Sequence, residues 1–106
     1  MSAFVNHEEL SILLAGVEKP ILLDVRRKDD FETSPEKIVG AEWLDPSLVG
    51  EWGDSIPQDR PVVVYCVRGG SVSQSVAGKL SSTHPDVRFL QGGITSWTEN
   101  GGAVEK

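Results

Sequence analysis

The chain's single cysteine, Cys66, stands at the end of an apolar segment and directly before a loop rich in glycine. The stretch reads VVVYCVRGGS, so Arg68, Gly69 and Gly70 follow the thiol within four residues. Glycine permits positive φ and removes side chains, which lets several backbone N–H groups converge on one point. Together with the charge of Arg68 and the N-terminus of a following helix, such a loop should hold an anion and favour a thiolate. These residues indicate a nucleophilic cysteine beside an anion-binding loop.

The segments on either side of Cys66 are expected to place it at the functional edge of a sheet. Residues 61–66, PVVVYC, are apolar, rich in β-branched residues and opened by a proline, which predicts a buried strand. Ser71 and Gln74 have the spacing of a capping box, so we expect a helix from about residue 71 that ends before Pro85. Reactive groups in open parallel sheets gather beyond the carboxyl ends of the strands. Cys66 would lie at such an end.

Three more apolar segments are too short for helices and are expected to be strands. They are residues 21–25, 41–44 and 87–90. Strands of this kind that alternate with helices predict an α/β unit with a mainly parallel sheet.

Helical periodicity is clearest near the start of the chain. Leu10, Leu13, Leu14 and Val17 recur at i, i+3, i+4 and i+7, which predicts a helix over residues 7–17. Asn6 and Glu9 form a capping-box pattern before this helix. After residue 71, the predicted helix face carries Val72, Val76, Ala77 and Leu80. A short helix before Pro35 and a last helix that carries Ile94 and Trp97 complete the predicted elements.

Composition and charge limit the partners that the chain can have. The 106 residues are 39% apolar and 25% charged, which is ordinary for a soluble domain. The net charge of −6 argues against nucleic acid as the main partner. There is no run of about 18 apolar residues and no basic, apolar leader, so we expect neither a membrane partner nor secretion but a cytoplasmic protein. One cysteine and two distant histidines offer no disulfide and no zinc-ligand spacing, so we expect no metal.

Three motifs in order make the chain similar to the single-domain rhodaneses, a family of sulfurtransferases. The motifs are LLDVRRKDDF with KIVGA, then VVVYCVRGGS, and finally LQGGITSWTENGGAV. The resemblance covers nearly the whole chain. It implies a single α/β domain over residues 1–106, with a mainly parallel five-stranded sheet flanked by helices on both faces.

The resemblance also implies a reaction and a site. Cys66 would take a sulfane sulfur from a donor, thiosulfate or a persulfide, and would pass it as a persulfide to cyanide or a thiol. The implied partners are these small molecules, with a sulfur-relay protein or a thioredoxin-like reductant as further candidates. No base or cofactor is implied, because the thiolate is already formed. The outer sulfur would be surrounded by the backbone N–H groups of the loop residues Val67, Arg68, Gly69, Gly70, Ser71 and Val72.

Three positions depart from the family pattern, and we interpret them as shifts in substrate preference. Lys37 stands where a histidine is usual, Ser71 where an arginine is frequent and Val72 where a serine is common. The net charge of −6 also disfavours capture of a dianion such as thiosulfate, so we expect a persulfide donor.

Two other functions remain open at this point. The strand–loop–helix arrangement also serves phosphatases and arsenate reductases, but these need a C-x5-R loop, and the residue six positions after Cys66 is Val72. A non-catalytic or regulatory binding module would also tolerate the departures at Lys37 and Val72. Gain of a sulfur atom by Cys66 would separate the enzyme from the module.

Charged and aromatic residues outside the loop are expected to be structural. Asp24 and Arg26 should tie loops together by paired hydrogen bonds. Trp97 should anchor the last helix in the core. Packing, capping or solvation is expected for the remaining indole and imidazole side chains, those of Trp43, Trp52, His7 and His84.

Overall fold

All neighbouring strands of the central sheet run parallel in the computed structural model, which describes residues 3–106. The strand order is β1-β6-β5-β2-β4. The strands are β1 (Ala3–Val5), β2 (Ile21–Asp24), β4 (Glu42–Trp43), β5 (Val62–Tyr65) and β6 (Val87–Leu90). The predicted five-stranded parallel sheet is confirmed, and β5, the strand that leads to the cysteine, lies at its centre.

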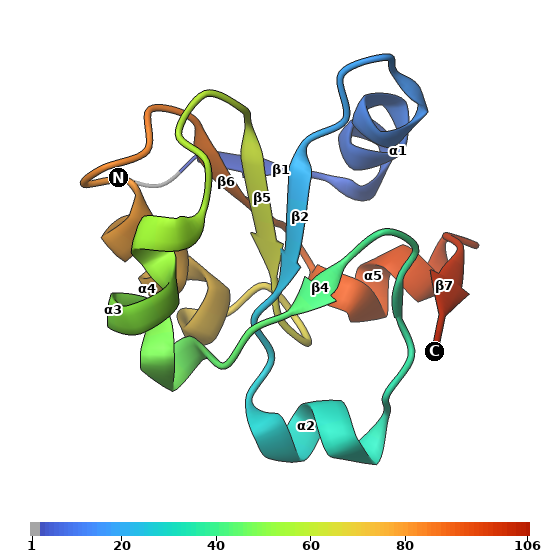
Figure 1. Ribbon diagram of the computed structural model, residues 1–106. Helices are drawn as coiled ribbons and strands as arrows, with labels where there is room; N and C mark the ends of the chain where they lie inside the picture. The colour runs from blue at the N-terminus through green and yellow to red at the C-terminus, as the bar shows by residue number, and fades with distance from the viewer. Residues whose placement is uncertain (1–2) are drawn as a thin grey trace.

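Helices cover both faces of the sheet (Figure 1). On one side lie α3 (Val49–Trp52) and α4 (Ser71–Leu80), and on the other lie α1 (His7–Ala15) and α5 (Gly93–Glu99). The short α2 (Lys28–Thr33) lies beyond the carboxyl ends of β2 and β5. Two 3-10 turns, η1 (Pro46–Leu48) and η2 (Gly53–Ser55), flank α3. The α/β fold with helices on both faces is therefore confirmed.

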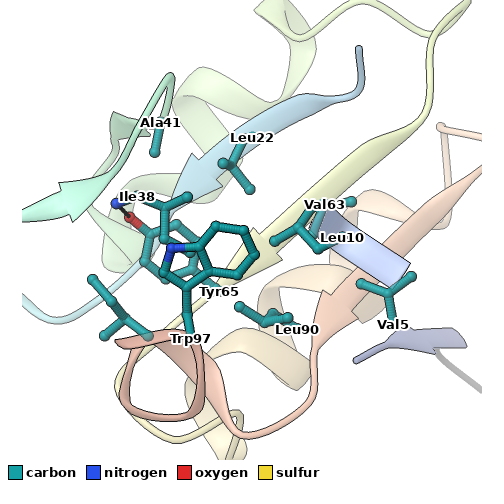
Figure 2. Packing of buried hydrophobic residues seen from close by; sticks show 10 residues of the cluster. Val5, Leu10, Leu22, Ile38, Ala41, Val63, Tyr65, Leu90 and Trp97 are labelled. Atoms are coloured by element: carbon teal, nitrogen blue, oxygen red, sulfur yellow. Dashed lines mark hydrogen bonds between the residues drawn. The ribbon is translucent and has the colours of Figure 1, made fainter. Parts of the chain in front are cut away.

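The alternating side chains of β5 explain why its sequence is a continuous apolar run. Val62 and Val64 pack with the α3 and α4 side, whereas Val63 and Tyr65 pack with the α1 and α5 side. Because both faces of the strand are buried, every position must be apolar or carry a satisfied polar group. Figure 2 shows the second of these two cores, in which Tyr65 lies beside Trp97 from α5. Trp97 is 6% exposed, which confirms its predicted role as a core anchor.

Asp24 and Arg26 form a buried ion pair at the end of β2. The Arg26 Nη2 lies 2.6 Å from the Asp24 Oδ2. The same guanidinium donates hydrogen bonds to the carbonyl oxygens of Ser34 and Glu36, at 2.8 and 2.9 Å. This confirms the structural role expected for the pair, which fastens the segment around α2 to the end of the sheet.

Tyr65 extends this buried network into the core. Its hydroxyl accepts a hydrogen bond from the Ile38 N–H at 3.1 Å (Figure 2). The same hydroxyl donates a hydrogen bond to the Asp24 Oδ2 at 3.1 Å. Burial, and then the charge of Asp24, raise the pKa of Tyr65 well above its usual range. The hydroxyl is therefore neutral in the folded protein at any physiological pH.

Indole and imidazole side chains outside the core take packing and capping roles. Trp43 is half-buried and stacks on Phe31 with ring centroids 5.0 Å apart, and Trp52 is half-buried and donates to the Asp45 carbonyl at 2.7 Å. His84 is 2% exposed, and a ring nitrogen lies 3.2 Å from the carbonyl oxygen of Leu80. Its Nε2 lies closer to the carbonyl oxygen of Ile56, at 2.8 Å, so the buried ring joins the end of α4 to the segment after η2, and the solvation considered for it is wrong.

The ends of two helices differ in part from the sequence prediction. The capping box at Asn6 and Glu9 is confirmed by reciprocal hydrogen bonds of 2.8 and 3.0 Å. However, α1 ends at Ala15 rather than at residue 17, because Gly16 is extended and its N–H returns to the Leu13 carbonyl.

The capping box predicted at Ser71 and Gln74 is wrong. Gly70 is the N-cap of α4, and the side chain of Gln74 instead donates to the carbonyl of Gly69 at 3.0 Å. Gly70 therefore occupies the N-cap position that the sequence pattern predicted for Ser71. The first amides of α4 are left without a side-chain cap.

A small second sheet closes the domain beside α5. It pairs β3 (Lys37–Ile38) with β7 (Val104–Glu105) in antiparallel orientation. No helix among residues 3–106 is both long and apolar enough to cross a membrane.

Candidate active site

Cys66 lies directly after β5, at the carboxyl end of the central strand. Its side chain is 6% exposed and reaches a cleft of about 290 Å³. Cys66 is therefore shielded from solvent, but it lies at the wall of a cleft and belongs to neither hydrophobic core. The cleft is lined by Arg27, Asp30, Cys66, Val67, Arg68, Gly70, Ser71 and Val72.

The loop after Cys66 carries a series of unpaired backbone donors. In the part of the chain that the structure describes, none of the N–H groups from Val67 to Ser73 donates to a backbone carbonyl. The first N–H of this region that does so belongs to Gln74, which bonds the Gly70 carbonyl at 3.2 Å. The N–H groups of the first turn of α4 are free for an anion and lie at the positive end of the helix dipole. This is the electrostatic setting in which a thiolate or a persulfide anion is stabilised.

The start of α5, just after the glycine pair Gly92-Gly93, is hydrogen-bonded to this loop. The N–H groups of Ile94 and Thr95, in the first turn of α5, donate to the carbonyls of Cys66 and Val67, each at 3.0 Å. Gly93 has a φ of 60°, and a Cβ at this position would collide with both carbonyl oxygens. The glycine therefore allows α5 to approach the cysteine loop, and this gives the closing motif of the sequence a direct role at the site.

Gly69 supports the loop but does not line the cleft. Its φ is 71°, and a Cβ there would lie 2.7 Å from the Leu90 carbonyl oxygen and 2.8 Å from the Gly92 nitrogen. Of the loop residues predicted from the sequence, five line the cleft: Val67, Arg68, Gly70, Ser71 and Val72. Gly69 instead lies buried against the end of β6.

Two arginines supply positive charge to the cleft. Arg68 was expected there, whereas Arg27 follows β2 and was not identified from the sequence. Neither forms an ion pair within residues 3–106, and Asp30 lines the same cleft. The signal that could have identified Arg27 is its position just beyond the end of the strand next to β5, because parallel strands end at the same edge.

Ser73 is a second residue that the sequence analysis missed. The Cys66 Sγ donates a hydrogen bond to the Ser73 Oγ at 3.2 Å, and Ser73 is completely buried. The buried residues of α4 are Ser73, Val76, Ala77 and Leu80. This is an i, i+3, i+4, i+7 series, so the buried stripe begins at Ser73, and the placement of Val72 on that face is corrected. Val72 is half-buried and lines the cleft.

A larger cavity of about 560 Å³ adjoins the cysteine cleft and shares Arg27, Ser71 and Val72 with it. Its wall carries both signs of charge. Asp45 belongs to it, and hydrogen bonds from the Ser47 hydroxyl and N–H lower the pKa of that carboxyl group, so it is ionised at neutral pH. The other lining residues are Lys28, Asp29, Pro46, Ser47, Ser75 and Val76.

Comparisons with known proteins agree with this architecture. The rhodanese-like domain family matches residues 7–100 of the chain. A rhodanese-related protein from Thermoplasma volcanium has a similar structure, with a TM-score of 0.83, 23% identity and coverage of 97% of both chains. A rhodanese-like domain from Anabaena has a TM-score of 0.82 and 27% identity, over 99% of this chain and 80% of that one.

Relatives found by sequence carry sulfurtransferase names. A sulfurtransferase from Allochromatium vinosum is 33% identical over 97 residues, covering 92% of this chain and 89% of the relative. The thiosulfate sulfurtransferase GlpE from Coxiella burnetii is 36% identical over 78 residues, covering 73% and 70%. The probable adenylyltransferase/sulfurtransferase MoeZ from Mycobacterium tuberculosis is 34% identical over 90% of this chain, which spans only 24% of the relative. Since the family match covers most of its length, the chain belongs to the rhodanese-like domain family and is related to its sulfurtransferases.

Proposed function

We propose that the protein is a sulfurtransferase that carries a sulfane sulfur on Cys66 as a persulfide. The observation that supports this most directly is the position of Cys66, which lines one cleft together with loop and α4 residues whose N–H groups have no backbone partner. A persulfide anion is large and diffuse, and several amide donors suit it better than one localised charge. The proposed cradle consists of the amides from Val67 to Val72.

The proposed reaction has two steps, and neither needs a cofactor. In the first, the Cys66 thiolate attacks the outer sulfur of the donor, the donor S–S bond breaks, and its electron pair leaves with the donor as sulfite or a thiolate. In the second, an acceptor nucleophile, cyanide or a thiolate, attacks the outer sulfur of the Cys66 persulfide. The Cys66 S–S bond then breaks, and its electron pair returns to the Sγ.

The donor that we propose is a low-molecular-weight persulfide with a zwitterionic body, rather than thiosulfate. The net charge of −6 opposes long-range capture of small anions in general, and Asp30 partly offsets Arg27 and Arg68 within the cleft, so the body of the donor rather than its net charge would decide the preference. The adjoining cavity of about 560 Å³ exceeds what thiosulfate requires and has Lys28 and Asp45 on its wall. Such a cavity suits a peptide that carries an ammonium and carboxylates. A sulfur-relay protein or a thioredoxin-like reductant is a further proposed acceptor.

The test is formation of thiocyanate from cyanide with two donors, thiosulfate and glutathione persulfide. The proposal predicts turnover that depends on Cys66 and is lost in Cys66→Ser, with the higher kcat/KM for the persulfide. Activity that survives in Cys66→Ser, or no turnover with any sulfane donor, contradicts it. Turnover of an aryl phosphate would instead support the phosphatase alternative. The sequence does not favour that alternative, because Val72 stands where a phosphatase loop needs an arginine.

A further inference from the structure

The hydroxyl of Ser73 has an unusual environment for a serine in a helix. Among the side chains of residues 3–106, its one hydrogen-bond partner is the Cys66 thiol, at 3.2 Å, and its exposed fraction is 0%. A serine in a helix commonly satisfies its hydroxyl on the carbonyl four residues earlier. Ser81, at the other end of α4, does so with the Ala77 carbonyl at 2.7 Å. The hydroxyl of Ser73 is instead directed at the nucleophile.

A thiol is a poor partner for a buried hydroxyl, whereas a thiolate is a good one. The S–H group is a weak donor and neutral sulfur is a weak acceptor. A hydrogen bond to an ionised partner is roughly twice as strong as a neutral one. The hydroxyl rotates freely about its C–O bond, so it accepts from the S–H of neutral Cys66 and donates once the proton is lost. The Ser73 hydroxyl therefore obtains its strongest interaction only when Cys66 is ionised.

We propose that Ser73 is a catalytic residue whose hydroxyl stabilises the Cys66 thiolate. It does so before sulfur uptake, and again during sulfur release, when the Cys66 thiolate is the leaving group. This proposal rests on the proposed function only for the second of these roles. When an acceptor thiolate attacks the outer sulfur, the Cys66 S–S bond breaks and its electron pair forms the Cys66 thiolate. The Ser73 O–H donates to that sulfur as the charge develops, while the loop amides contact the outer sulfur. No proton is transferred in this step.

The position of Ser73 gives the two sulfur atoms separate donors. Ser71 is exposed and Val72 has no hydroxyl, so Ser73 is the buried hydroxyl of the first turn of α4. A group that stabilises a thiolate speeds its departure but lowers its intrinsic nucleophilicity. Loss of Ser73 should therefore slow sulfur release more than it slows attack on the donor. It should also slow attack at neutral pH but not at alkaline pH, where the thiol is fully ionised.

The test compares Ser73→Ala with the unmodified protein in a reaction that requires no sulfur transfer. The rate of Cys66 alkylation by iodoacetamide is measured from acidic to alkaline pH. Loss of a hydrogen bond to a charged group should displace the pH profile of alkylation upward and slow alkylation about fivefold on its acidic limb, whereas in alkali the variant should react at least as fast as the unmodified protein. Release of sulfur from the preloaded persulfide to a thiol should slow by at least as much. Thermal unfolding checks the fold, and alanine suits a buried helix position.

The matched control is Ser82→Ala, which removes an exposed hydroxyl just beyond the C-terminus of α4. Its alkylation profile should coincide with that of the unmodified protein. An unchanged profile in Ser73→Ala contradicts the assignment of Ser73, even if Cys66 carries sulfur. A displaced profile supports the assignment, even if no persulfide forms on the unmodified protein, so failure of this inference is distinguishable from failure of the proposed function.

Discussion

The backbone N–H of Ile94 donates a hydrogen bond of 3.0 Å to the carbonyl oxygen of Cys66. This contact joins the first turn of α5 to Cys66 itself, across 28 positions of sequence. The loop is consequently held on one side by the amides of α5, while the amides from Val67 to Ser73 have no backbone partner. The shape of the cleft thus depends on a glycine motif that lies well outside the cysteine loop.

Gly93→Ala should displace the cysteine loop. A non-glycine residue at positive φ costs about 1–2 kcal/mol, and the new Cβ would in addition collide with the carbonyls of Cys66 and Val67. We expect a loss of stability in urea unfolding well above that backbone cost, together with a loss of Cys66 reactivity. Gly101→Ala is the matched control, because Gly101 has a φ of 82° with open space around it. Equal effects of the two substitutions would contradict the contact between α5 and the loop.

Arg27→Ala should separate glutathione persulfide, the proposed type of donor, from thiosulfate. Arg27 lines both the cysteine cleft and the larger cavity, so its loss should slow persulfide formation from glutathione persulfide more than from thiosulfate. One exposed ionic contact contributes on the order of 1 kcal/mol, so the expected decrease is about fivefold. The effect should shrink at high ionic strength, because salt screens exposed charges.

Arg60→Ala controls for the loss of one positive charge, since Arg60 precedes β5 and lies at the opposite edge of the sheet. It should leave both donor rates unchanged. A slower reaction of both donors in Arg27→Ala, in equal proportion, would show that the larger cavity plays no part in donor selection.

Alkaline pH should destabilise the fold through Tyr65. The pKa of this hydroxyl is raised in the folded state by burial and by Asp24, whereas an unfolded tyrosine has a pKa of about 10. Above that pH the unfolded state binds fewer protons than the folded state, so the stability contributed by Tyr65 is complete at lower pH and declines as the pH rises. Tyr65 is the single tyrosine, so tyrosinate absorbance reports on it alone.

The absorbance of tyrosinate in alkali should therefore appear together with loss of the tryptophan fluorescence signature of the fold, and not before it. In Tyr65→Phe the decline of stability above pH of about 10 should be shallower, although the loss of hydrogen bonds to Asp24 and Ile38 lowers stability at neutral pH. Tyrosinate that forms while the protein remains folded would contradict the buried network.

The strands next to the site were predictable because their sequences leave few alternatives. The run before Cys66 is short, apolar and rich in β-branched residues, and this combination favours a strand buried on both faces. By contrast, β1, β3 and β7 are two or three residues long, and their pairing is decided by the tertiary fold rather than by local sequence. The centre of the sheet was therefore predictable from local sequence, whereas these short strands were not.

At the candidate site, the position of Cys66 at the end of a strand was predictable, and part of its surroundings was not. Cys66 and Arg68 belong to one contiguous loop, whereas Arg27 reaches the cleft from another strand. Ser73 was missed because the apolar Val72 was assigned to the buried stripe that Ser73 begins. Helical periodicity is read from apolar residues, so it does not identify a small polar residue that occupies a core position of the helix.

The mass of the intact protein after brief treatment with a persulfide donor tests the central claim most directly. The account predicts a gain of one sulfur atom that maps to Cys66, disappears on addition of cyanide or a thiol, and is absent in Cys66→Ser. A protein that keeps its original mass with thiosulfate, glutathione persulfide and polysulfide alike would contradict a persulfide carrier and leave a binding module in its place.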